Sequence, residues 1–324
     1  MTILINVFGI SYIIRCPFKI IGAYKYHLLN IAICATIVDL HLSFYFVGYP
    51  LLPVFGFCAA GWTRNFDKFF AVDLPYAILI QLFGMYGLSL VNAILYHMTK
   101  ILGNKTIFRS KKAVIISMTI QIVYPMPAWI FHLCLTSSKS DIITYAQIHM
   151  QQAAQYIESH ACSFLILSSP VYVYFAISLF LVFLCSTTVF VCCVIAVLLL
   201  MRNKSAKLSK DYRLFKEMTI GLISQLVFPL LTALLPMIWM AYEILRTSGN
   251  PAETTPMAFQ IFSSHSVINI LAMAVFTKPL RRGLQTGPIP NIEINGSHEL
   301  FERRHPVPSR PQTTSAVLTV RHHH

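Results

Sequence analysis

The stretch LPYAILIQLFGMYGLSLVNAILYH, residues 74–97, decides the fold class of this chain. A helix of roughly 20 apolar residues crosses the 30 Å hydrocarbon core of a bilayer, and this stretch has that length. Inside lipid only helices and closed barrels satisfy their backbone groups, and a continuous apolar block this long is typical of a helix. We therefore predict a transmembrane helix here and an integral membrane protein.

Further apolar blocks lie on both sides of this stretch. Five long blocks cover residues 28–48, 113–135, 175–201, 218–242 and 256–276, and a short one covers residues 1–14. Hydrophobic residues make up 56% of the chain and charged residues 11%, which is far from a soluble mixture. We predict an all-α membrane protein, a seven-transmembrane helix bundle over residues 1–284. The proline-rich, polar residues 285–324 are predicted to form a disordered cytosolic tail.

The positive charges alternate from loop to loop. The first, third and fifth connections hold 14 Lys and Arg residues, whereas the intervening loops hold 4 and the tail holds 7. The positive-inside rule places the richer set and the tail in the cytosol and the N-terminus outside. The net charge of +13 therefore reflects membrane topology. We expect no nucleic-acid partner, because the basic residues form no single patch interleaved with aromatics.

The first block, residues 1–14, is shorter than a comfortable span. As a helix it extends roughly 21 Å. It also lacks the basic start and the small-residue cleavage site of a signal peptide. Three interpretations stay open: a truncated first span, a short span with local thinning of the bilayer, or an incomplete gene model.

Ionisable residues inside the predicted spans are candidate functional residues, because they are costly in lipid and often functional. Asp39 lies in the second span, His132 in the fourth and His265 in the seventh. For Asp39, an anchor between helices and a switch or ion-binding role both stay open. For His265, a packed polar contact and a ligand contact stay open. We expect Asp39 to face the bundle interior, with polar partners from Ser264–Ser266 or Asn269.

The sequence shows no catalytic set, no metal-ligand spacing and no phosphate-binding glycine loop. We therefore predict that the chain is not an enzyme and has no cofactor or metal site. Cys58 and Cys162 fall in the two predicted outer loops, where a disulfide is chemically permitted and would tie the loops together. Pairing of Cys162 with Cys134, or no pairing at all, are the open alternatives.

Three stretches share a residue pattern with a known family. They are KYHLLNIAICATIVDLHLSF with PLLPVFGFCAAGW, residues 25–44 and 50–62; KLSKDYRLFKEMTIGLISQLVFPLLTALLP, residues 207–236; and SSHSVINILAMAVFTKPLRRGL, residues 263–284. Their order and spacing resemble those of nematode serpentine chemoreceptors of the Srh/Sri type, over nearly the whole chain. The resemblance implies a G-protein-coupled receptor in the plasma membrane of a sensory-neuron cilium. Such a receptor would bind a small-molecule ligand and a heterotrimeric G protein.

We predict that a response to ligand runs through the inner ends of the third, fifth and sixth predicted spans, with the basic inner extension of the sixth at the contact surface. Pro229 and Pro236 could each hinge that span. The basic face attracts acidic partners through a screened field, so we predict it as the G-protein contact. It consists of Lys207, Lys210, Arg213 and Lys216. The alternative is that these charges only hold the loop in the cytosol and touch anionic lipid.

The chain departs from the family pattern at two places. Family members begin with an outer segment and a full first span, so the resemblance favours truncation for residues 1–14. They usually carry an acidic residue and an Arg at the inner end of the third span, where Leu95–Lys100 has neither. Two alternatives to a signalling chemoreceptor therefore stay open: a small-solute membrane transporter or channel, and a receptor-like membrane protein that does not couple.

Overall fold

The computed structural model describes residues 2–15, 24–51, 56–101, 111–166, 168–202, 216–225 and 265–276, with isolated helical positions between 227 and 242. All of these residues belong to one unit, Met1–Gln285. The predicted tail, residues 285–324, lies outside the described residues. So does much of the two predicted spans 218–242 and 256–276.

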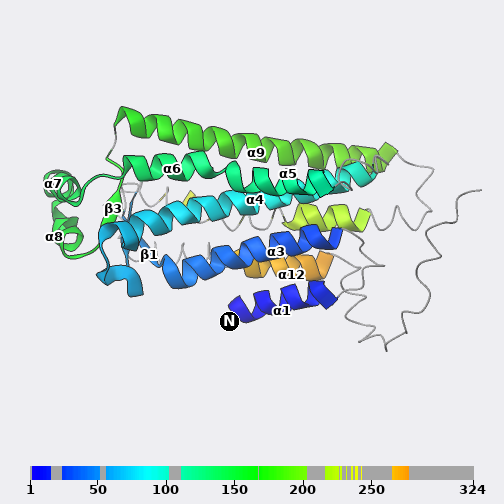
Figure 1. The fold of residues 1–324 in the computed structure, drawn as a ribbon, viewed down its shortest axis with the longest axis horizontal. Helices are drawn as coiled ribbons and strands as arrows, with labels where there is room; N and C mark the ends of the chain where they lie inside the picture. The colour runs from blue at the N-terminus through cyan, green and yellow to red at the C-terminus, as the bar shows by residue number, and fades with distance from the viewer. Residues whose placement is uncertain are drawn as a thin grey trace, which may run out of the picture. The chain divides into compact units, whose positions relative to one another are not determined.

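Helices make up most of this unit (Figure 1). In chain order they are α1 (Thr2–Arg15), α3 (Tyr24–Leu40), η1 (His41–Tyr45), η2 (Trp62–Asn65), η3 (Phe69–Asp73), α4 (Leu74–Ile101), α5 (Lys111–Val123), α6 (Met126–Leu135), α7 (Lys139–His149), α8 (Gln151–Ser159), α9 (Ser169–Arg202) and α12 (His265–Phe276). Within the described residues, four runs are long and apolar enough to cross a membrane. They are Tyr24–Tyr45, Phe69–Thr99, Lys112–Leu135 and Ser169–Leu199.

These four runs fall on four of the predicted spans, 28–48, 74–97, 113–135 and 175–201, and extend some of them. The second run begins earlier than predicted because the turn η3 continues directly into α4. The short first block forms α1, which spans 14 residues. The predicted helical bundle is therefore confirmed over the described part of the chain.

Helix α4 lies at the centre of the packing and contacts α3, α5, α6 and α9. Its Gly84 meets the fourth span at Pro125, where an added Cβ would lie 2.4 Å from the proline side chain. Only glycine fits this contact, and small residues are what allow membrane helices to approach closely. Helix α3, which packs against α4, also contacts α1 and α12.

The predicted fourth span is one run broken into two helices. Helix α5 ends at Val123 and α6 begins at Met126, with Tyr124 and Pro125 forming a turn. Proline lacks an N–H donor and its ring clashes with the preceding helical turn, which explains the break. The Tyr124 hydroxyl bridges to α9 by donating to the carbonyl oxygen of Leu181 over 2.8 Å.

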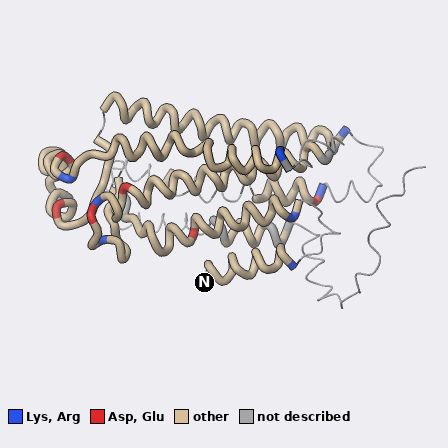
Figure 2. Tube along the Cα trace, viewed as in Figure 1, with Lys and Arg blue, Asp and Glu red and all other residues tan. Residues whose placement is uncertain are grey.

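The outward faces of α5 and α9 are apolar. Phe180, Phe183 and Phe190 of α9 are each more than 60% exposed, and Ile115 and Ile116 of α5 are exposed as well. Figure 2 shows that charged residues gather at the two ends of the bundle and leave most of the helix length uncharged. A continuous apolar surface of this kind suits lipid contact.

A small antiparallel sheet, which the sequence analysis did not predict, covers one end of the bundle. It has the order β1 (Gly48–Leu51), β2 (Gly56–Ala59), β3 (Cys162–Phe164). The strand β3 pairs with β2 from more than 100 residues away along the chain, so no local pattern could reveal the pairing. We call this end of the bundle the sheet end, and the end where α4 finishes the opposite end.

Candidate functional site

A disulfide joins the two connections at the sheet end. The structure links Cys58 of β2 to Cys162 of β3, which face each other in the register of the sheet with their Cα atoms 3.9 Å apart. This separation lies within the reach of about 7 Å that a disulfide requires. Cys134, the competing partner, is exposed and free.

A buried ion pair fastens the same region. The Lys68 amine donates to the Asp73 carboxylate over 2.7 Å and to the carbonyl oxygen of Ser137 over 2.7 Å, and it lies 3.5 Å from the Ser163 hydroxyl. Both side chains are largely removed from water. Sequence reasoning missed this pair, because Lys68 and Asp73 look like ordinary loop charges.

His132, predicted as an ionisable residue inside a span, lies buried beneath the sheet. Its ring lies 4.7 Å from that of Tyr76 in α4 and 6.0 Å from that of Tyr174 in α9, between centroids. Tyr76 in turn packs against Phe57 of β2, at 5.0 Å. The Nδ1 atom of His132 and the indole nitrogen of Trp129 are both buried, and neither hydrogen-bonds to any residue that the structure describes.

Asp39 lies in the bundle interior, only 1% exposed, and accepts a 3.0 Å hydrogen bond from the Asn6 side chain of α1. The expected partner Asn269 is fully buried on α12 but hydrogen-bonds to none of the described residues. His265, the ionisable residue predicted inside the seventh span, is the first residue of α12.

A second polar group joins three helices through Gln121 of α5. Its side-chain oxygen accepts from Asn30 of α3 at 3.0 Å and from Asn92 of α4 at 3.2 Å. Its side-chain nitrogen lies 3.4 Å from the Cys34 sulfur of α3. Neither Asn6 nor Gln121 was predicted as a functional residue. A single amide side chain within an apolar block could have indicated both, because such amides form hydrogen bonds between membrane helices.

At the opposite end, a side-chain hydrogen bond joins α4 to the helical segment 216–225. His97 Nε2 lies 2.6 Å from the Thr219 hydroxyl, and both residues are buried. Aromatic rings surround this contact: His27 packs on Tyr96 at 4.6 Å, and Tyr24 lies 6.1 Å from His97, between centroids. This contact occupies the place where the sequence analysis noted a missing acidic–arginine pair.

Of the four residues predicted to contact a G protein, the structure describes one. Lys216 begins the segment 216–225 and is exposed. Lys207, Lys210 and Arg213 lie outside the described residues. The structure therefore places one predicted contact residue three positions before Thr219, on the same helix.

The chain as a whole is similar to one protein family. The family model for the serpentine type 7TM GPCR chemoreceptor Srh matches residues 1–286. No curated protein matches the chain. The match includes the apolar runs, the sheet end and the His97–Thr219 contact, and it makes the chain a multi-pass membrane protein of a receptor family rather than of an enzyme family. The chain belongs to the Srh family of serpentine seven-transmembrane chemoreceptors.

Proposed function

We propose that this chain binds a small environmental chemical near the sheet end and passes the signal to a heterotrimeric G protein at the opposite end. The sheet end and the N-terminus face outside, and the opposite end and the C-terminus face the cytosol. The split of 14 basic residues against 4 supports this orientation. The receptor family supports a location in the plasma membrane, at a sensory-neuron cilium.

The ligand site is proposed beside Trp129 and His132. These residues are three positions apart on α6, so they lie on the same side of that helix. Each has a buried ring nitrogen without a hydrogen bond to a described residue. An unsatisfied buried polar atom lowers the free energy of unfolding by about 1–3 kcal/mol. A ligand with a hydrogen-bonding group could satisfy one of these atoms. His132→Leu should therefore weaken the response to an agonist without removing the receptor from the surface.

The hydrogen bond between His97 and Thr219 is the observation that carries the proposal. It ties α4 to the sixth span at the end that faces the G protein. A side-chain hydrogen bond between membrane helices is weak, about 0.6 kcal/mol on average, so it can hold one arrangement without locking it. A ligand that favours the arrangement in which this bond is broken would shift the population toward the signalling state.

The basic residues beside this bond are the proposed G-protein contact. Lys216 stands at the start of the same helix as Thr219, and Lys207, Lys210 and Arg213 precede it in the chain. Release of Thr219 from His97 would move this basic face relative to α4. Neutralising all four residues should leave the topology intact and abolish coupling. A response of full size with correct topology would reduce these residues to topological signals.

Thr219→Ala tests the proposed function directly. Loss of about 0.6 kcal/mol from the resting arrangement should raise basal G-protein signalling roughly threefold in a heterologous cell. Thr219→Ser keeps the hydroxyl and serves as the matched control with unchanged basal signalling. Signals would be normalised to surface expression.

Two results would contradict the proposal. One is equal basal signalling for Thr219→Ala and wild type across all G-protein classes, together with no agonist response. The other is ligand-dependent solute flux into vesicles that carry the purified protein, since flux would favour the transporter or channel. A receptor-like protein without coupling would give neither signalling nor flux.

A further inference from the structure

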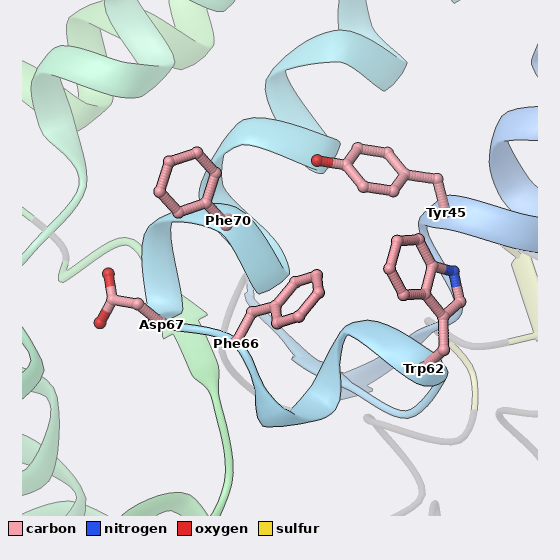
Figure 3. Close-up of a pocket in the computed structure, with 5 residues that line it drawn as sticks. All are labelled: Tyr45, Trp62, Phe66, Asp67 and Phe70. Carbon is pink, nitrogen blue, oxygen red and sulfur yellow. The ribbon is translucent and has the colours of Figure 1, made fainter.

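An open pocket at the sheet end is lined almost entirely by aromatic rings. Its volume is about 430 Å³, and its lining residues are Tyr45, Trp62, Phe66, Asp67 and Phe70. They come from the end of η1, from η2, from the short link after η2 and from η3 (Figure 3). This pocket is separate from Trp129 and His132, which do not line it.

The rings face the pocket from different directions. The centroids of Tyr45 and Trp62 are 6.0 Å apart with their planes at 42°, and those of Trp62 and Phe66 are 5.3 Å apart at 85°. Figure 3 shows Tyr45 and Trp62 on one side of the pocket, Phe70 on the other and Phe66 between them. Aromatic faces carry partial negative charge, so rings arranged around one space attract a cation placed among them.

The polar side-chain groups of the pocket lie in different places, and Figure 3 shows the Tyr45 hydroxyl directed toward Phe70, into the pocket. The Trp62 indole N–H donates to the carbonyl oxygen of Phe44. The Asp67 carboxylate accepts from the Phe69 backbone N–H over 3.3 Å, and Figure 3 shows it pointing away from the rings, at the rim. The pocket therefore offers aromatic rings and one hydroxyl inside and a negative charge at its edge.

The local charges leave this carboxylate available. Lys68, the next residue in the chain, is committed to the buried Asp73 at 2.7 Å. That contact is the only ion pair among the residues that the structure describes, so Asp67 pairs with no described lysine or arginine. Arg64, the other cation of this segment, does not line the pocket.

The simple alternative is an aromatic belt, because tyrosine and tryptophan gather at membrane interfaces as anchors. A belt would spread its rings around the bundle, whereas these rings converge on one cavity beside a carboxylate that forms no ion pair with a described residue. We propose that this pocket binds the alkylammonium group of a small organic cation, such as a quaternary amine. The inference goes beyond the proposed function, since binding here requires no signalling output.

Two kinds of molecule could bring an alkylammonium group to this pocket. One is a free organic amine from outside, and the other is the choline headgroup of an outer-leaflet phosphatidylcholine. The aromatic site would recognise the trimethylammonium group in either case. The experiment must therefore separate the two by the lipid that surrounds the protein.

The test measures binding of choline to the full chain in phosphatidylglycerol nanodiscs by saturation-transfer nuclear magnetic resonance. The control ligand is 3,3-dimethylbutan-1-ol, an uncharged analogue of choline in which carbon replaces the quaternary nitrogen and the shape is retained. We expect choline to bind at least about tenfold more tightly than dimethylbutanol. Equal affinities, or no choline signal, would overturn the proposal, because an apolar pocket or an aromatic belt does not select the charge.

Variants connect this selectivity to the pocket. Phe66→Leu and Phe70→Leu keep apolar volume but remove a π face, and each should weaken choline binding about threefold to fivefold. Tyr172→Leu, an exposed aromatic on α9, is the matched control and should change nothing. Unfolding temperatures of all variants would separate loss of binding from loss of fold.

Asp67→Asn keeps a side-chain oxygen for the Phe69 N–H and removes the charge. It should weaken choline binding about threefold at low salt, with a smaller effect near 1 M salt, where the Debye length falls to about 3 Å. Glu158→Gln, an exposed acid on α8, is its control. No difference between Asp67→Asn and Glu158→Gln at low salt would remove Asp67 from the site and overturn the charge argument.

The lipid arm then identifies the source. In phosphatidylcholine nanodiscs, suppressed choline binding would show that lipid headgroups occupy the pocket, and unchanged binding would point to a free amine. Both results support an ammonium site, because both require recognition of the same group. The binding readout is independent of G-protein coupling, so its failure and the failure of the proposed receptor mechanism can be told apart.

Discussion

The two ends of the bundle are held together by different kinds of interaction. At the sheet end, the Cys58–Cys162 disulfide joins segments that are 104 positions apart in the sequence. The amine of the buried Lys68–Asp73 ion pair also donates to the carbonyl oxygen of Ser137, 69 positions further along the chain. At the opposite end, α4 meets the helical segment 216–225 through the side-chain hydrogen bond between His97 and Thr219. Breaking a disulfide or leaving one partner of a buried ion pair alone costs about 2–5 kcal/mol, more than loss of one side-chain hydrogen bond between membrane helices.

This difference indicates a division of labour along the bundle. The disulfide and the ion pair hold the sheet end in place, so that the proposed ligand sites beside His132 and in the aromatic pocket would be preformed. A weakly joined opposite end can change its arrangement for a small change in free energy. The following changes test this contrast, from the largest expected effect on stability to the smallest.

Removing the buried lysine should cost the most. Lys68→Met leaves the Asp73 carboxylate buried without its cation, and loss of one partner of a buried pair costs about 3–5 kcal/mol. We expect a lower unfolding temperature in detergent and reduced surface expression. Lys139→Met, at an exposed position of α7, is the control.

The double variant Lys68→Met with Asp73→Leu should recover much of this loss, because no charge is then left buried and unpaired. An unfolding temperature for Lys68→Met equal to that of wild type would mean that the ion pair does not brace the sheet end.

The disulfide should come next. It closes a sequence separation of 104 residues, and replacing Cys58 and Cys162 by serine should lower the free energy of unfolding by about 2–4 kcal/mol. Reductant should lower the unfolding temperature of wild type and leave that of the double variant unchanged. Cys134→Ser, at a free cysteine, should behave as wild type. Insensitivity of wild type to reductant would argue that no bridge forms.

The amide cluster in the middle of the bundle should have an intermediate effect. Gln121→Leu leaves Asn30 and Asn92 without their acceptor, and we expect a loss of about 1–2 kcal/mol from the free energy of unfolding. Gln147→Leu, at an exposed position of α7, is the matched control. Equal unfolding temperatures for the two variants would show that Gln121 does not hold the three helices together.

Asp39→Asn should have the smallest effect on stability. Asparagine keeps an oxygen that can accept from Asn6, so we expect less than about 1 kcal/mol of change in the free energy of unfolding. The response to agonist should change if Asp39 is a switch. Unchanged surface expression together with an unchanged response would leave Asp39 as a hydrogen-bonding residue and reject the switch.

The spans could be predicted because hydropathy over about 20 residues is a local property of the chain. Runs such as 74–97 therefore appear as α4 with little change in bounds. The position of Asp39 in the interior also followed from a local cost, that of a charge in lipid. Its partner did not, because Asn6 contacts α3 only once α1 packs beside it.

The sequence near a residue could not predict a hydrogen-bond partner on another helix of the bundle. Thr219 looks like any threonine in an apolar run, and its role depends on His97, which lies 122 positions earlier. The aromatic pocket likewise joins Tyr45 to residues 62–70 through the fold of the connection between them. Sequence spacing says nothing about such pairs, since each is set by the packing of separate elements.

The sequence by itself determined that this protein crosses a membrane, where the described spans lie and which family it resembles. These properties depend on composition and order along the chain, which the bilayer selects segment by segment. Only the tertiary structure decided that a sheet covers one end, that Lys68 donates to the Ser137 carbonyl and that His97 binds Thr219. The physical reason is that a hydrogen bond or ion pair requires atoms within about 3 Å, and only the packed helices bring such distant residues together.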